Sequence, residues 1–270
     1  MASTGFAKLM QEGFVSFDVP ATDPAGLVAE LEAGAALPWA WVPGSGDGTA
    51  PADEPLPGSA SAGEGAGARP SASAAHRRVA RAVALAPDRI IGFVYGSPNH
   101  PEASLQQIEQ HAVHGPFRGI KLWVCQLADH AGNDPICARA AQLGLPVLQH
   151  TWFKATGNLP TESEPRHLLT LAQRHPQTNF IMAHAGGDWE RGLRTVRNAP
   201  NVYPDTCGND PEAGFTELAV RLLGAERIVF GSDATGRSFG SQMAKVTGAD
   251  ISDEAKRLIL GWNLLRLMQG

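Results

Sequence analysis

The chain has 270 residues, of which 43% are hydrophobic and 18% are charged, and its formal net charge is −5 at pH 7. This is an ordinary composition for a globular protein that buries a large core. The acidic balance argues against a nucleic-acid-binding protein, and no apolar run approaches the roughly 20 residues that span a bilayer. The expected partner is a small-molecule substrate, with no role for nucleic acid or membrane.

The cysteines are three in number, Cys125, Cys137 and Cys207, and no two of them have Cys-x-x-Cys spacing. Such a set fits neither a disulfide framework nor a structural zinc cluster. Residues 1–13 contain no apolar stretch followed by a cleavage site of small residues, so a secretory signal is not visible. These features predict a reducing, cytoplasmic location.

Two strands are expected in the N-terminal part, at residues 14–19 and 38–42. The second is followed by residues 44–75, which are rich in Gly, Ser, Ala and Pro. We expect a low-complexity mobile loop there, because few large apolar residues are available to offset the entropy of ordering. Both a tolerated insertion and an active-site lid are compatible with such a loop.

Beyond this loop, short β-branched or aromatic runs alternate with longer helical patterns, as in a parallel sheet covered by helices. The expected strands are residues 90–95, 119–124, 146–149, 179–183, 202–205 and 227–231. The expected helices are residues 101–114, 135–143, 165–174, 189–197, 212–223 and 252–268. With the two N-terminal strands, this pattern predicts a single (β/α)8 TIM-barrel domain over residues 1–270, irregular at its N-terminus. A doubly wound open sheet has the same alternation, so periodicity alone does not close the barrel.

Polar residues end three of the expected strands, at His150, His184 and Asp233. In a parallel barrel the carboxyl ends of the strands face the reaction site, so polar residues there are informative. One such histidine is more often a hydrogen-bonded structural residue, but three polar strand ends together favour a site. Imidazole and carboxylate bind a borderline metal such as zinc, and an imidazole also carries protons near neutral pH. The predicted metal ligands are therefore His150, His184 and Asp233, with His184 and Asp233 also as catalytic residues.

Further residues near these ends are candidates for substrate binding. Lys121 lies in an apolar strand and either binds an anion or reaches solvent at the rim. Arg237 follows Asp233 in a flexible loop and is a candidate clamp for a carboxylate. Trp123 is expected to line the site, and Asp205 to support a histidine from behind. Two more tryptophans, Trp152 and Trp189, also follow strands, and the helical histidines His76, His111, His114, His167 and His175 are expected to be solvated.

These motifs, in this order, resemble the amidohydrolase-2 family of the amidohydrolase superfamily, which includes aromatic-acid decarboxylases and hydrolases. The markers are Pro87-Asp-Arg-Ile-Ile-Gly-Phe93, Arg118-Gly-Ile-Lys-Leu122, Gly144-Leu-Pro-Val-Leu-Gln-His150, Ala183-His-Ala-Gly-Gly187, Asn201-Val-Tyr203, Arg227-Ile-Val-Phe-Gly-Ser-Asp233, Ser252-Asp-Glu254, Asn263 and Arg266-Leu267. The resemblance implies His150 as a metal ligand, His184 as a second ligand or the general acid/base, and Asp233 as a ligand or base. It also implies a His-x-His pair at the end of the first strand, where this chain has Asp18 and no histidine.

Three functional hypotheses follow from the missing pair. The first is an enzyme that holds a divalent metal, expected to be zinc, and hydrolyses or non-oxidatively decarboxylates a small carboxylated or cyclic substrate. The second is an enzyme of the same site that works without metal through His184 and Asp233. The third is a catalytically degenerate partner subunit of an intact homologous amidohydrolase. The resemblance also implies a homodimer, or a heteromer with such a homologue.

Overall fold

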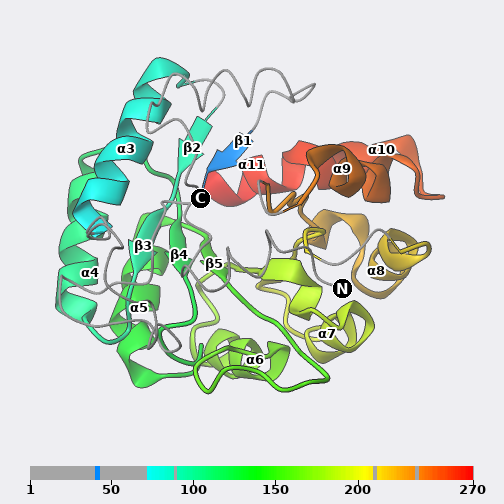
Figure 1. Ribbon diagram of the computed structural model, residues 1–270, viewed down its shortest axis with the longest axis horizontal. Coiled ribbons are helices and arrows are strands. Elements are labelled where there is room, and N and C mark those ends of the chain that lie inside the picture. Colours follow the sequence, from blue (N-terminus) through cyan, green and yellow to red (C-terminus); the bar gives the residue numbers. More distant parts are fainter. Residues whose placement is uncertain (1–39, 43–71, 88–89, 209–211, 235–236, 270) are drawn as a thin grey trace, which may run out of the picture.

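Parallel strands follow one another around a centre, with helices outside them, in the computed structural model (Figure 1). The structure describes residues 40–42, 72–87, 90–208, 212–234 and 237–269. The expected strand at residues 14–19, Asp18 and most of the expected loop, residues 44–71, lie outside the described residues. Within the described residues, no helix has both the length and the apolar composition that a membrane span requires.

The strands of the described residues pair only in parallel. β1 (Ala40–Val42) pairs with β2 (Ile90–Gly92). The larger sheet runs in chain order through β3 (Val94–Gly96), β4 (Ile120–Leu122), β5 (Val147–Gln149), β6 (Phe180–Met182) and β7 (Val202–Pro204). The expected strand at 90–95 is thus divided into β2 and β3. A parallel order with helical crossovers is the (β/α) barrel arrangement, although the ladders of the described residues do not close into a full ring.

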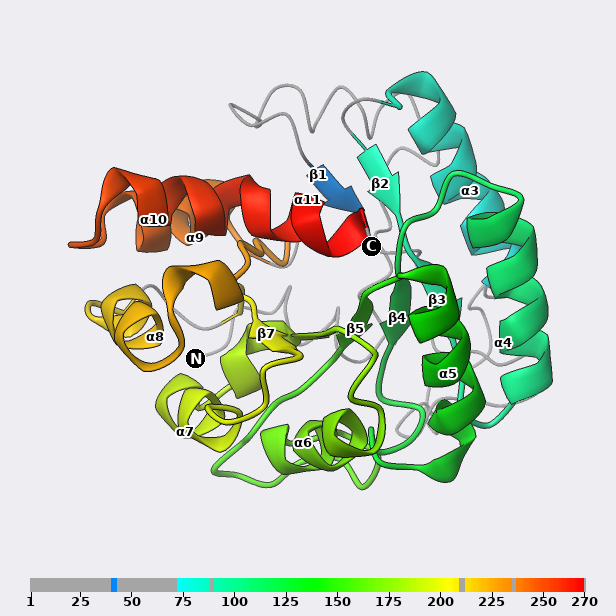
Figure 2. The ribbon, with the colours of Figure 1, turned by 180° about the vertical axis from the view of Figure 1, so that it is seen from behind.

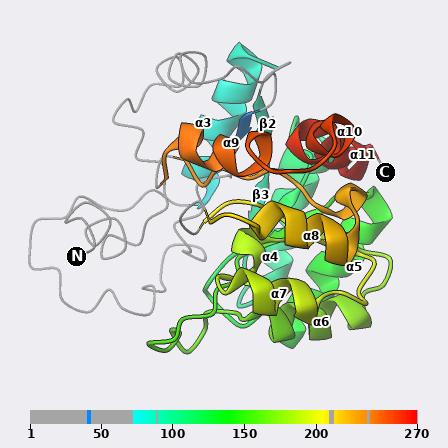
Figure 3. The ribbon, with the colours of Figure 1, turned by 90° about the vertical axis from the view of Figure 1, so that its right-hand side faces the viewer.

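The helices surround this arc of strands (Figure 2). They are α3 (Ala72–Leu85), α4 (Pro101–Ile108), α5 (Asp134–Leu143), α6 (Pro165–Arg174), α7 (Trp189–Thr195), α8 (Phe215–Leu223), α9 (Phe239–Thr247), α10 (Asp253–Arg257) and α11 (Asn263–Met268). Of these helices, α11 also contacts the inner side of the arc. A π-helical turn extends α4 over Glu109–Val113, and another joins α10 to α11 over Leu258–Trp262. In side view the helices descend from α9, α10 and α11 through α8 and α7 to α6 (Figure 3).

Alternate strand residues face two different apolar clusters. In β5, Val147 packs outward with the helices, whereas Leu148 faces an inner cluster. In β6, Phe180 and Met182 face outward and Ile181 faces inward. The inner cluster contains Phe93, Leu148, Ile181, Ala183, Val229 and Leu267, so α11 helps to fill the centre of the strands. The interior is therefore a packed core, and chemistry is confined to the strand ends.

Three elements differ from the sequence-based expectation. Helix α3 begins at Ala72, so residues 72–75 of the expected loop are helical, and Val79 and Val83 bury one face of this helix. Helix α9 was not expected, because its buried residues include the polar Gln242 and Lys245. Residues 227–231 do not form a regular strand, and only Val229 makes a single parallel bridge, to Asp205. The N–H of Phe230 donates instead to the carbonyl of Ile259 in the C-terminal helices, at 2.8 Å.

Two of the helical histidines are buried, which corrects the expectation that they are solvated. His76 has no exposed surface, and its Nε2 accepts a hydrogen bond from the backbone N–H of Tyr95 at 3.0 Å. Its Nδ1 therefore carries the proton and donates to Gln107 Oε1 at 2.9 Å. The ring of His111 packs against His76 and stacks on Phe117. Burial lowers the pKa of His76 from 6.5 to about 4, since the charged ring would lose its hydration.

This depressed pKa predicts a loss of stability in mild acid. Below pH 6.5 the His76 side chain is protonated in the unfolded chain, whereas in the folded chain it is protonated only near pH 4. His76 should therefore lower the free energy of unfolding by about 3 kcal/mol as the pH falls through this window. Urea unfolding between pH 7 and about pH 4 should show a shallower pH dependence for His76→Gln than for the wild type. The exposed-site control His114→Gln should keep the wild-type slope, and equal slopes for all three proteins would contradict the prediction.

Candidate functional site

The site residues lie at the carboxyl-terminal edge of the parallel strands. His150 follows β5, His184 follows β6, and Asp205 follows β7. Lys121 is the central residue of β4 and pairs in register with Leu148 of the inner cluster, so its side chain starts one layer below His150. Parallel pairing thus brings side chains that are far apart in the sequence to one edge.

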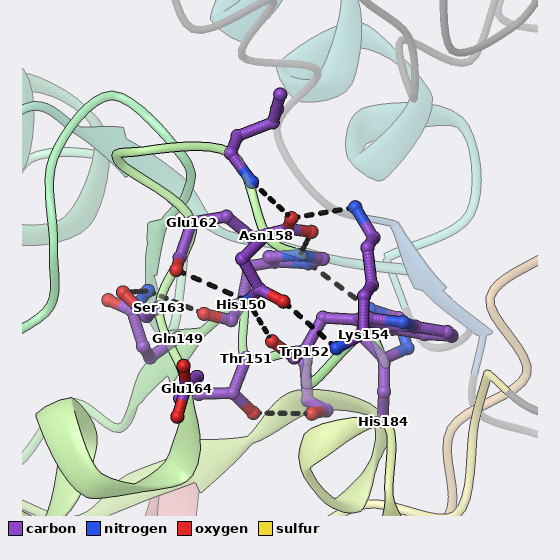
Figure 4. Close-up of polar contacts among 12 residues, drawn as sticks. Gln149, His150, Thr151, Trp152, Lys154, Asn158, Glu162, Ser163, Glu164 and His184 are labelled. Carbon is purple, nitrogen blue, oxygen red and sulfur yellow. Dashed lines mark hydrogen bonds and ion pairs between the residues drawn. The ribbon is translucent and has the colours of Figure 1, made fainter. Parts of the chain in front are cut away.

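The side chains of His150 and His184 contact each other at this edge. His150 Nδ1 lies 3.3 Å from His184 Nε2, and the ring centroids are 5.0 Å apart at 72° (Figure 4). The ring of Trp152 stacks parallel to His150 and meets His184 edge-on. Burial lowers the pKa of His150 and, more strongly, that of His184, so both rings are neutral at neutral pH. A neutral imidazole pair offers lone pairs to a metal or a proton.

Each imidazole is anchored at the nitrogen that faces away from the other. His150 Nε2 donates to the carboxylate of Glu162 at 3.2 Å, and His184 Nδ1 lies 3.2 Å from the sulfur of Cys207. Glu162 is 4% exposed, and hydrogen bonds from His150 and Lys154 hold its pKa at about 2 in spite of its burial. The carboxylate is therefore ionised and accepts hydrogen bonds only.

An unusual backbone turn brings His184 into this position. Strand alternation would point residue 184 outward, like Phe180 and Met182. Instead, His184 and Ala185 adopt left-handed angles, with φ values of 62° and 45°. Such angles cost a non-glycine residue roughly 1–2 kcal/mol, which the surrounding structure must offset. Asp233 also has a left-handed backbone, with φ 51°.

Asp205 holds this turn through the main chain. Its Oδ1 accepts the backbone N–H groups of His184 at 2.8 Å and Cys207 at 3.0 Å. Asp205 thus contacts His184 as the sequence suggested, but through the backbone rather than through the imidazole ring. Burial raises the pKa of this carboxyl, while the hydrogen bonds from Cys207 and His184 oppose the rise.

Positive charge surrounds the same strand ends. Lys121 interacts electrostatically with Asp205 and Asp233, and burial lowers its pKa to about 8. Burial, together with the nearby Asp205, raises the pKa of Asp233 to about 6. Arg237 is close enough to lower the pKa of His184 and Asp233, and its backbone N–H donates to the carbonyl of Asp233 at 3.0 Å. These charges favour an anionic substrate beside the imidazole pair.

The structure places the predicted residues unequally. It brings His150 and His184 together, with Lys121 and Arg237 within electrostatic reach of His184. Asp205 and Asp233 interact with each other and with Lys121. Trp123 is partly exposed just past β4. Trp189 packs on Phe215 and donates to Glu212, so it belongs to the helical layer and not to the imidazole pair.

Three further residues of the site were not found from the sequence, namely Cys207, Glu162 and Lys245. Cys207 lies two residues beyond Asp205, and its place after β7 was the available signal. Glu162 lies 12 residues after His150 in an irregular segment, where no periodicity marks it. Lys245 comes from the unexpected helix α9, and its Nζ donates to the carbonyl of Thr206 at 3.1 Å.

A divalent metal fits the imidazole pair. Two nitrogen ligands of a tetrahedral zinc ion, each about 2.0–2.1 Å from the metal, are about 3.4 Å apart. The 3.3 Å between His150 Nδ1 and His184 Nε2 matches this spacing. Among the described residues, Asp233 does not join these nitrogens as a third closely spaced ligand.

A different trio, His184, Asp205 and Cys207, does have ligand atoms within 4.8 Å of one another. Asp205 Oδ1 is already occupied by two backbone N–H groups. Gly208 packs so closely that a Cβ there would lie 2.8 Å from His184 Nδ1. Burial also raises the pKa of the Cys207 thiol well above its usual value, which keeps it protonated. We therefore interpret this trio as the support behind His184.

Removing the acceptor at residue 205 should loosen this support. Asp205→Ala leaves two buried N–H groups unpaired and should lower the free energy of unfolding by about 2–4 kcal/mol. Asp205→Asn keeps an amide oxygen for both donors and should cost less than half as much. Urea unfolding of the two variants at pH 7 measures the difference, and equal losses would refute the role of this oxygen.

Comparison with known proteins identifies the family of this chain. A family model described as Amidohydrolase matches residues 43–267. No protein with a curated description matches the chain in sequence.

Solved structures give a consistent fold. A 2,6-dihydroxybenzoate decarboxylase from Rhizobium is 19% identical, with a TM-score of 0.60 over 72% of this chain and 76% of that one. A TIM-barrel protein from Bordetella bronchiseptica is 20% identical, with a TM-score of 0.60 over 72% of each chain. A dihydroxybenzoic acid decarboxylase from Polaromonas sp. JS666, with bound manganese and the inhibitor 2-nitroresorcinol, is 19% identical, with a TM-score of 0.59 over 72% and 74%. The fold is that of a TIM barrel, and the chain belongs to the amidohydrolase family.

Proposed function

We propose that this protein catalyses the metal-assisted, non-oxidative decarboxylation of a small carboxylated aromatic compound. The observation that carries the proposal is the pair of neutral imidazole nitrogens 3.3 Å apart, with cationic side chains beside it. Structurally similar proteins that act on dihydroxybenzoates support this substrate class. Hydrolysis of a small cyclic substrate is the second reaction that such a site supports.

In this proposal His150 and His184 hold the metal through Nδ1 and Nε2. When bound, the metal polarises an oxygen of the substrate and so stabilises the negative charge that develops during reaction. Imidazole nitrogens suit zinc, whereas manganese, which a similar structure contains, is better matched by oxygen ligands. Zinc is therefore the metal we propose.

The remaining residues bind the substrate and move the proton. Lys121 and Arg237 orient the anionic substrate, and Trp123 borders it. As the bond between the ring carbon and the carboxylate breaks, CO₂ leaves and its bonding electrons stay on the carbon. Asp233, in its protonated form, delivers its proton to that carbon and is left as a carboxylate, which completes the reaction without an oxidant. Asp205 keeps His184 in its left-handed turn.

Two further properties belong to the same proposal. We place the protein in the cytoplasm, which is consistent with the three free, buried cysteines. We also propose that it forms a homodimer or a heteromer with a homologous amidohydrolase, which light scattering on purified protein would measure.

Changing His150 should remove the metal, whereas changing Asp233 should remove activity and leave the metal in place. Zinc-loaded, dialysed wild type should retain close to one equivalent of zinc per chain, and His150→Ala should lose most of it. Asp233→Asn should keep the zinc but decarboxylate 2,6-dihydroxybenzoate at least about 100-fold more slowly, since it has no proton to deliver. Elemental analysis and CO₂ release measure the two effects.

A metal-independent enzyme and a non-catalytic partner subunit would give different results in the same assay. Wild type that is folded and active without metal would support the metal-independent acid/base enzyme. Wild type that is inactive alone but raises the activity of an intact homologue would support the partner subunit. Either result would reject the proposed reaction of this chain.

A further inference from the structure

Glu162 lies in the segment between β5 and α6, which is held together by internal hydrogen bonds. The backbone N–H of Trp152 donates to the carbonyl of Ser163 at 2.7 Å, and the side chain of Asn158 bridges Lys154 and Trp152 (Figure 4). The segment is also tied to its surroundings, because the Ser163 hydroxyl accepts the N–H of Ala128 at 2.8 Å. Glu162 is therefore held in place independently of His150.

The two oxygens of Glu162 have different partners. Oε1 accepts from His150 Nε2 at 3.2 Å. Oε2 accepts from Lys154 Nζ at 2.6 Å and from the backbone N–H of Leu159 at 3.2 Å. Oε1 is thus the acceptor for the imidazole, and Oε2 accepts hydrogen bonds from two donors of the segment itself.

This arrangement decides which nitrogen of His150 carries the proton. A carboxylate accepts but does not donate, so His150 must carry its proton on Nε2. Nδ1 then presents a lone pair, and this is the nitrogen that faces His184. The opposite tautomer would place a proton on the nitrogen proposed to bind metal.

We propose that Glu162, held by Lys154 and Leu159, is a positioning residue that fixes the tautomer and orientation of His150 so that Nδ1 is available to a metal. The metal-binding part of this inference rests on the proposed function, whereas the tautomer does not. Partners of this kind behind ligand histidines typically contribute 10- to 100-fold to metal affinity.

Glu162→Gln is a sharp test because an amide has one acceptor and one donor end. Lys154 and Leu159 present two donors, so the amide oxygen should turn toward them. The NH₂ group then faces His150 Nε2 and donates to it, which moves the imidazole proton to Nδ1. Glu162→Asp keeps two acceptors and should preserve the wild-type tautomer. Glu164→Gln makes the same chemical change two residues along, at the start of α6, and is the matched control.

Nitrogen NMR of metal-free protein with ¹⁵N-labelled histidine reads the tautomer directly, with His150 assigned by its absence in His150→Gln. We expect the proton on Nε2 in wild type, Glu162→Asp and Glu164→Gln, and on Nδ1 in Glu162→Gln. A folded Glu162→Gln protein that keeps the Nε2 proton would overturn the proposal.

Zinc affinity, measured by competition with a chromophoric chelator, tests the metal-binding part of the inference separately from the tautomer. Glu162→Gln should bind zinc about 10- to 100-fold more weakly than wild type, and Glu164→Gln should match wild type. Equal affinities for Glu162→Gln and wild type would overturn the positioning role. If wild type binds no zinc while the tautomer still changes in Glu162→Gln, Glu162 positions His150 and the proposed metal chemistry fails.

Discussion

The contact between His150 and His184 is the interaction on which the rest of the site depends. Their facing nitrogens are 3.3 Å apart, and their outward nitrogens contact Glu162 and Cys207. The two facing nitrogens cannot both carry protons without repulsion. Burial and the contacts of the two outward nitrogens therefore determine the protonation of the rings. A metal ion or a single shared proton satisfies the pair.

The charge balance around this contact explains why both rings stay neutral. Lys121, Arg237 and Lys245 disfavour a further positive charge on His184, in addition to the effect of burial. The same three cations stabilise the carboxylate of Asp233, and Lys121 and Lys245 stabilise that of Asp205, against the rise in pKa that burial causes. A carboxylated substrate would add negative charge to an edge where cations are already concentrated, and would gain affinity from them.

Much of the fold follows from local sequence patterns. Apolar runs of three to five residues ending in His150 or His184 predict strands whose carboxyl ends share one edge, and the structure confirms both strands. Helix α6 begins and ends as expected, because Pro165 marks its first turn. Residues 227–231 also have a strand pattern, but a long-range hydrogen bond to Ile259 diverts their backbone, and no local pattern contains that contact.

The site is predictable only in part, for a similar reason. The alternation of side chains along a strand places Lys121 and His150 on the inner face of the sheet, but it would point the side chain of His184 outward. The left-handed turn at His184 depends on an acceptor from Asp205, 21 residues later. Glu162 reaches His150 from an irregular segment whose shape is set by Asn158 and Ser163. Contacts of this kind depend on tertiary structure and leave no periodic trace in the sequence.

X-ray absorption at the zinc edge of the loaded protein tests the central claim most directly, because nitrogen and sulfur ligands scatter at different distances. Two imidazoles at about 2.0–2.1 Å, with oxygen completing the shell, are expected for a metal between His150 and His184. A sulfur ligand at about 2.3 Å would instead place the metal at Cys207 and contradict the imidazole pair as the metal site.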